Sequence, residues 1–214
     1  MNKILFLFLS AILLISCGKD NTDYENIDPY ANIKVAFGTN IDLNNLENYA
    51  NQPIPSYVLT DNTDGNPITD KEATLGRVLF YDKNLSSNNT ISCSSCHKQE
   101  LAFGDDAMVS QGVNGTSGRH SMRLVNNRFS LESKYFWDER ASSLEEQTIM
   151  PIQDHKEMGF SGQNGDPNFS ELITKLNSIG YYKELFKFVY DSEEINAEKI
   201  KVALSQFIRS IQSF

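Results

Sequence analysis

Cysteine and positive charge are both scarce in this sequence of 214 residues. Its 19 Lys and Arg face 28 Asp and Glu, which gives a formal net charge of −9. So little basic surface cannot neutralise many phosphates, and we therefore expect no nucleic-acid binding. The three cysteines are an odd number at uneven positions, with Cys17 alone and Cys93 close to Cys96, so no disulfide network can be drawn. The length allows one domain or two small ones.

The first residues have the pattern of an export signal. Lys3 precedes an apolar run from Ile4 to Ile15, which is too short to cross a hydrocarbon core of ~30 Å as a helix. The end of this run, Leu14-Ile15-Ser16-Cys17, resembles the lipobox of bacterial lipoproteins, in which the signal is cut before a cysteine that then carries lipid. We expect a signal peptide at 1–16, a lipidated Cys17, and attachment on the periplasmic side of a Gram-negative cell envelope. The alternative is an ordinary secretory signal with a coincidental cysteine.

The rest of the chain divides into a lead-in and a helical part. Residues 17–67 are rich in Asn, Asp, Thr and Pro without a sustained apolar period, so we expect a tether and a loosely packed lead-in. Residues 68–214 show no convincing alternating strand, which predicts a mainly α fold. The last helix runs to the final residue without a cap and looks interrupted. The expected helices cover about 70–82, a short segment opened by Ser142 with Glu145 and stopped near Pro151, an apolar face at 169–176 ended by Gly180, a second face at 182–189, and a stripe from Ile200 to Ile211 with Asn196 as N-cap.

The segment Cys93-Ser94-Ser95-Cys96-His97 has the C-x-x-C-H pattern of covalent haem attachment. In this pattern both thiols bond to the haem edge and the adjacent imidazole ligates the iron. Long loops surround the motif, and long ordered loops in a compact domain usually wrap something. A structural zinc site would need a second Cys/His pair, and a thioredoxin-like pair would need a strand–helix setting. A simple disulfide is the third alternative. The exported chain and the adjacent His favour haem.

Motifs on both sides of this pattern resemble the bacterial dihaem cytochrome c peroxidase family, which includes the MauG-like proteins. The resemblance implies a cytochrome c-like haem domain at 68–214, in which long loops wrap a covalently attached haem c. In that family the N-terminal haem is the one that reacts with peroxide. The matching segments are Leu75–Asp82, Leu85-Ser86, Thr90–His97, Leu101–Phe103, Arg119–Asn126, and Phe136-Trp137-Asp138-Glu139-Arg140 onward to Gly159.

The same resemblance gives roles to four side chains. Glu157 and Gln147 match distal-pocket residues, and Trp137 matches the aromatic residue between two haems. A carboxylate such as Glu157 can take a proton from peroxide and return it to the departing oxygen. An amide such as Gln147 can donate a hydrogen bond to the developing charge. We expect Arg140 to pair with a haem propionate. The ordinary alternatives are a core tryptophan, a solvated glutamine and a glutamate facing water.

Two features depart from the family pattern. Many members carry an iron-ligating His in the Gly-rich loop after the haem motif, where this chain reads Gln111-Gly112-Val113-Asn114-Gly115. We therefore expect a five-coordinate or water-bound iron without prior reduction, unless His120 or His155 substitutes. The second C-x-x-C-H domain of the family, with its second haem, is missing. We expect a fragment of a longer gene product, with a true single-haem relative as the alternative.

These observations lead to a functional hypothesis. We expect a lipid-anchored haem peroxidase that reduces hydrogen peroxide to water with electrons from a small cytochrome c or cupredoxin. The alternatives are a non-enzymatic haem protein that passes electrons or senses peroxide, and a MauG-like oxidation of a protein substrate. The resemblance also allows a homodimer and a calcium ion at the domain boundary, for which this chain offers no assignable ligands.

Overall fold

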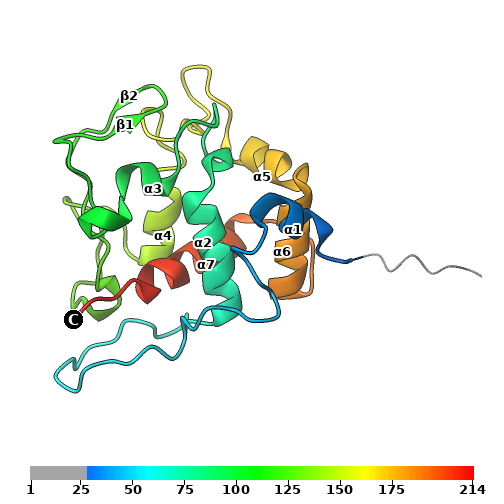
Figure 1. Cartoon of the computed structure of the whole chain (residues 1–214). Coiled ribbons are helices and arrows are strands. Elements are labelled where there is room, and N and C mark those ends of the chain that lie inside the picture. Colours follow the sequence, from blue (N-terminus) through cyan, green and yellow to red (C-terminus); the bar gives the residue numbers. More distant parts are fainter. Residues whose placement is uncertain (1–27) are drawn as a thin grey trace, which may run out of the picture.

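The computed structural model describes residues 28–214, so the expected signal peptide at 1–16 and the lipidated Cys17 lie outside the described residues. The described part is mainly α, as expected, and none of its helices is both long and apolar enough to cross a membrane. Two very short strands, β1 (Gln111–Gly112) and β2 (Gly115–Thr116), form an antiparallel hairpin. The helices are α1 (Ala31–Phe37), α2 (Asp70–Tyr81), α3 (Cys93–Cys96), α4 (Leu144–Ile149), α5 (Phe169–Asn177), α6 (Gly180–Tyr190) and α7 (Ala197–Ser210), with 3-10 turns η1 (Lys83–Leu85), η2 (Gln99–Leu101) and η3 (Asn127–Phe129) (Figure 1).

Helices α2 and α7 pack against each other at the centre of the molecule (Figure 1). Their contact includes Leu75 and Leu204, which are 0% and 1% exposed. Gly76 allows the close approach, because a Cβ at this position would stand 1.9 Å from the carbonyl oxygen of Ala203. Burial of such apolar side chains stabilises a fold by about 1.5–3 kcal/mol each. The tightly packed pair of α2 and α7 therefore supports the loops that carry the site.

Two helix ends follow local signals in the sequence. Thr69 caps α2 by accepting a hydrogen bond from the backbone N–H of Glu72, and Asn196 caps α7 by accepting one from Lys199. The expectation that the last helix continues to the final residue is wrong. It ends at Ser210, and the carbonyl oxygen of Ile211 accepts a hydrogen bond of 2.9 Å from the backbone N–H of Asn126. This contact with a distant loop competes with the next helical turn.

Two other helix signals are displaced from their expected positions. The N-cap of α4 is Ser143, which accepts from the N–H of Glu146, so the expected pair of Ser142 with Glu145 is one residue too early. Gly180 does not end a helix but is the first residue of α6. Its lack of a side chain is explained by packing, because a Cβ there would lie 2.6 Å from the side chain of Asn32.

Within the described part of the lead-in, α1 is packed onto the domain, so the expectation of loose packing is wrong for this helix; residues 38–67 form no helix or strand and contain no buried side chain. Ile33 of α1 is 1% exposed, and α1 lies along α6 (Figure 1). The carboxylate of Glu184 in α6 accepts hydrogen bonds from the backbone N–H groups of Asn32 and Ile33, at 3.0 and 2.9 Å. The N–H groups at the start of α1 are therefore bonded by a side chain about 150 residues away in the sequence. No local sequence pattern indicates this contact.

Candidate functional site

A cavity of about 660 Å³ lies between α3, α4, α7 and the loop at 117–140. This volume falls in the range of about 300–1,000 Å³ that is usual for ligand sites. Phe80 of α2 and Leu204 and Ile208 of α7 form part of its wall. All the site residues predicted within 68–214 line this one cavity: Cys93, Cys96, His97, Trp137, Arg140, Gln147 and Glu157.

One wall carries the C-x-x-C-H motif. Helix α3 is a single turn whose start is fixed by reciprocal hydrogen bonds between Ser92 and Ser95, and a turn brings positions three apart onto one face. Cys93 and Cys96 are free thiols, so the disulfide alternative is wrong for this structure. Burial raises the pKa of Cys93 to about 12 and also raises that of Cys96, unlike the lowered pKa of thioredoxin-type cysteines.

The chemistry of the donor set fits a covalently attached haem. Among residues 28–214 no three His, Cys, Asp or Glu side chains form a group that could hold a metal ion. His97 bonds through Nδ1 to the carbonyl oxygen of Phe103, at 2.9 Å. Burial lowers the pKa of His97. With Nδ1 bonded to this carbonyl oxygen, Nε2 is the ring nitrogen that would ligate an iron.

Glu157 lies on the wall of the same cavity. Burial, with a smaller contribution from the negative charge of Asp154, raises the pKa of its carboxyl to about 7, against an opposing effect of Arg140. A carboxyl with this pKa can both accept and donate a proton near neutral pH, as a general base and acid must. Glu157 is half-buried and lines the cavity, which favours a role in the site over that of a carboxylate that simply faces water.

The β1–β2 hairpin positions the backbone of Glu157. The N–H of Val113 donates to the carbonyl oxygen of Glu157 at 3.0 Å, and that of Asn114 donates to Lys156 at 3.2 Å. Gly112 makes the approach possible, because a Cβ there would stand 2.0 Å from the Lys156 carbonyl oxygen. The hairpin loop is thus hydrogen-bonded to the segment that presents Glu157.

Gln147 reaches the cavity from α4, and its side chain is half-buried. The start of this helix is held by Glu146, which accepts from Ser142, and by Glu145, which pairs with Arg209 of α7. These contacts fix the helix that presents the amide to the cavity.

Trp137 and Arg140 lie at the exposed side of the cavity. Trp137 is 59% exposed, so the alternative of a core tryptophan is wrong, and its Nε1 donates to the carbonyl oxygen of His120 at 2.8 Å. The guanidinium of Arg140 lies 3.5 Å from the ring centre of Phe136 and donates to Asp138 at 2.7 Å.

A second arginine, Arg119, lines the cavity and was not predicted. It also donates to Asp138 at 2.7 Å, and the two guanidinium groups lower the pKa of that carboxyl to about 2. Arg119 opens one of the segments that resemble the family, but its pairing with Asp138 is not visible in the sequence because the two residues are 19 positions apart.

The remaining histidines occupy different surroundings. His120 lines the cavity, and its Nδ1 is 3.0 Å from the carbonyl oxygen of Ala107. His155 is not among the lining residues, and its Nδ1 contacts the carboxylate of Asp166 at 2.8 Å.

Comparisons with known proteins place the chain in a family. The model of the di-haem cytochrome c peroxidase family matches residues 70–214. Methylamine utilization protein MauG of Methylophilus methylotrophus is 32% identical over 69% of this chain and 42% of that protein. Cytochrome c551 peroxidase of Nitrosomonas europaea is 35% identical over 63% of this chain and 38% of that protein. The crystal structure of a MauG-like protein associated with microbial copper homeostasis aligns with a TM-score of 0.64 and 32% identity, over 77% of this chain and 47% of that one.

Two conclusions follow from these matches. The chain spans less than half the length of each of these relatives. The matched residues include the C-x-x-C-H motif, the cavity and every described helix except α1. The chain belongs to the di-haem cytochrome c peroxidase family.

Proposed function

We propose that this chain is the peroxide-reacting haem domain of a haem c peroxidase. The overall reaction takes hydrogen peroxide, two electrons and two protons to two water molecules, with the electrons coming from a small cytochrome c or cupredoxin. The observation that supports it best is Glu157, whose carboxyl has a pKa near 7 and lies in the cavity that also contains the C-x-x-C-H motif. The direct test is consumption of peroxide by the full-length protein with a reduced small cytochrome as donor. Electron transfer without peroxide consumption would favour the non-enzymatic alternative.

In this proposal different residues bind the haem, transfer the proton and orient the peroxide. Haem held by Cys93 and Cys96 and ligated by His97 would supply an iron centre that exchanges electrons with peroxide. Glu157 takes a proton from the bound peroxide at its carboxylate oxygen and returns it to the departing oxygen. The Gln147 amide orients the peroxide and donates a hydrogen bond to the developing negative charge.

The arginines and Trp137 complete the proposal. Arg140, joined by Arg119, supplies positive charge for the haem propionates, which suits guanidinium–carboxylate geometry. Trp137, at the exposed side of the cavity, relays electrons between this domain and the second haem of a full-length protein.

A MauG-like oxidation of a protein substrate is the second candidate. The observation that favours it is again Trp137, because an indole that is 59% exposed can pass electrons to a protein bound outside the cavity. Peroxide consumption that requires an added protein substrate would select this reaction over simple peroxide reduction.

The rate should depend on pH through Glu157. Only the unprotonated carboxylate can accept the proton of peroxide, and its pKa is raised to about 7. We expect kcat/KM for peroxide to rise with pH, to reach half its plateau near pH 7, and to fall about tenfold per pH unit well below it. Steady-state rates from about pH 5 to about pH 9 measure this profile. A rate that is flat, or that falls through neutrality, would contradict the assignment.

The oxidised protein should show a high-spin haem spectrum as isolated. The reason is that Val113 and Asn114 occupy the loop where many relatives carry a ligating His, while His155 contacts Asp166. Absorption and electron paramagnetic resonance spectra of the oxidised protein test this expectation. A low-spin spectrum of the bis-His type that disappears in His120→Ala would show that His120 ligates the iron and would reject the prediction.

The anchor and location belong to the same proposal. We place the domain on the periplasmic side of the envelope through lipid on Cys17, which is supported by the sequence Leu14-Ile15-Ser16-Cys17. Labelled palmitate should enter the wild-type protein and not the Cys17→Ser variant. Equal labelling of the wild-type protein and the variant would show that Cys17 does not carry the lipid. The homodimer stays a prediction.

A further inference from the structure

Asp105 is a buried carboxylate close to the haem motif, and none of the roles above uses it. Its side chain is 4% exposed and pairs with Lys98 Nζ at 2.8 Å. It also accepts from the hydroxyl of Ser110 and from the backbone N–H groups of Asp106 and Ala107, at 2.8 and 3.2 Å. Burial alone would raise its pKa, but the hydrogen bonds from Lys98 and Ser110 hold the pKa below its ordinary value. Asp105 is therefore a buried, charged carboxylate that is stabilised by an ion pair and several hydrogen bonds.

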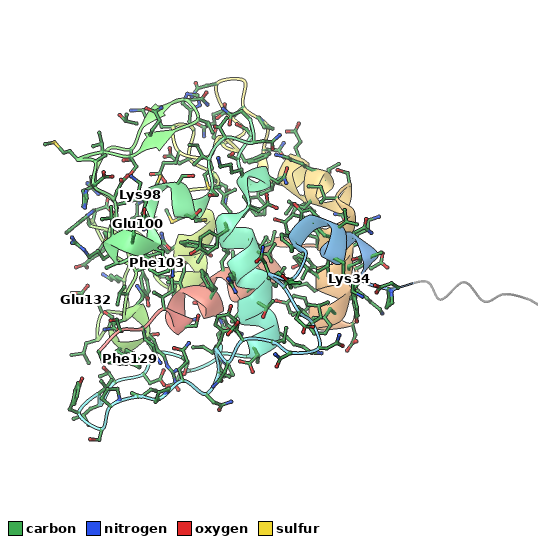
Figure 2. All side chains as sticks on the ribbon, in the orientation of Figure 1. Lys34, Lys98, Glu100, Phe103, Phe129 and Glu132 are labelled. Carbon is green, nitrogen blue, oxygen red and sulfur yellow. The ribbon has the colours of Figure 1, made fainter. Side chains whose placement is uncertain are left out.

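On one side Asp105 closes the turn that bonds to His97. Ala102 and Phe103 both have left-handed backbone angles, with φ of 55° and 56°, which non-glycine residues adopt only at a cost of about 1–2 kcal/mol each. The turn is held at its base, because Lys98 N–H donates to Gly104 at 2.7 Å and Phe103 N–H donates to Lys98 at 2.9 Å. Lys98 and Phe103 lie near each other beside α3 (Figure 2). The result of this arrangement is the contact between the Phe103 carbonyl and His97 Nδ1.

On the other side one chain of hydrogen bonds runs from Asp105 to Trp137, and a second reaches Ser121, the neighbour of His120 in the sequence. Ser110, which donates to Asp105, lies 2.7 Å from the hydroxyl of Ser121. Ala107, whose N–H donates to Asp105, offers its carbonyl oxygen to His120 Nδ1 at 3.0 Å. The His120 carbonyl oxygen in turn accepts from Trp137 Nε1 at 2.8 Å.

We propose that Asp105 is a positioning residue that fixes two parts of the haem cavity wall together, by holding both the turn that bonds to His97 and the segment that holds Trp137. A hydrogen bond from Nδ1–H to a carbonyl makes the imidazole a more basic ligand, which favours oxidised iron. A buried negative charge nearby acts in the same direction. Asp105 thereby lowers the reduction potential of the haem. This inference rests on haem attachment in the proposed function and does not need peroxidase activity.

The test compares Asp105→Asn with Asp106→Asn in the haem-loaded full-length protein. Asp106 also contacts Lys98 but is 71% exposed, so it is a matched control. We expect Asp105→Asn to shift the one-electron equilibrium about tenfold toward reduced haem, a rise of about 59 mV in midpoint potential. Asp106→Asn should leave the potential unchanged. The lifetimes of Trp137 are obtained by subtracting the emission of the same protein carrying Trp137→Phe. They report the distance and orientation of Trp137 to the haem, and we expect a broader lifetime distribution in Asp105→Asn.

A second variant separates the two connections. Ser110→Ala removes the link toward Ser121 and should broaden the Trp137 lifetimes with little change in potential. Ser110→Ala also tests the proposal if the Asp105→Asn variant does not fold and attach haem. Unchanged Trp137 lifetimes in Ser110→Ala would then overturn the proposal. Haem-loaded Asp105→Asn protein with the potential and lifetimes of Asp106→Asn would overturn it directly. A wild-type protein without covalent haem would instead refute the proposed function.

Discussion

Replacing Glu157 by Gln in the full-length protein should lower kcat/KM for hydrogen peroxide by about 10²- to 10⁴-fold. The amide keeps the size of the side chain but cannot accept the proton of peroxide. Because Glu157 is not part of the C-x-x-C-H motif and the side chain keeps its size, the haem should still attach and its absorption spectrum should stay the same. Peroxide consumption at saturating donor and the spectrum of the same sample measure the two effects.

The matched control is Glu132→Gln. Glu132 also lines the cavity, but it is exposed at the surface (Figure 2). The chemical change is identical, so a loss of charge near the cavity would affect both variants, whereas loss of the proton acceptor affects Glu157→Gln alone. Full turnover in Glu157→Gln, or an equal loss in both variants, would remove Glu157 from the mechanism.

Local signals in the sequence predicted those parts of the fold whose partners are close along the chain. Thr69 and Asn196 cap their helices because each accepts a hydrogen bond from the backbone N–H three residues later. A spacing this short can be read directly from the sequence. The haem motif is equally local, since Cys93 and Cys96 lie within one turn. For these features sequence and structure agree.

Distant partners account for the misses. Glu184 caps α1, and Asn126 binds the end of the chain beyond α7, so neither helix boundary is visible in its own neighbourhood. The site shows the same division. The resemblance brought together Glu157 and Gln147, but the hairpin contact at Gly112 that holds Glu157 in place depends on a carbonyl 44 positions along the chain, at Lys156. Arg119 was missed for the same reason.

The largest expected effect on stability comes from Arg209→Ala. Arg209 is 5% exposed in its side chain and pairs with Glu145 of α4. Its Nε also donates to Asn62 at 3.0 Å, and Asn66 donates to Glu145 at 2.7 Å, so the pair joins α7, α4 and the lead-in. Loss of the guanidinium leaves a partly buried carboxylate without its counter-charge. We expect the free energy of unfolding to fall by about 3–5 kcal/mol, measured by urea denaturation.

The control for this change is Lys201→Ala on the same helix. Lys201 pairs with Glu198, whose side chain is 76% exposed, and such surface pairs contribute about 0–1 kcal/mol. Removing Arg209 and Glu145 together leaves no unpaired charge, so the double variant should lose less stability than the sum of the two single variants, by about 1 kcal/mol or more. Strict additivity, or a loss in Arg209→Ala no larger than in Lys201→Ala, would show that the pair does not hold α4. Since α4 presents Gln147 to the cavity, a real loss should also raise KM for peroxide in the variant that remains folded.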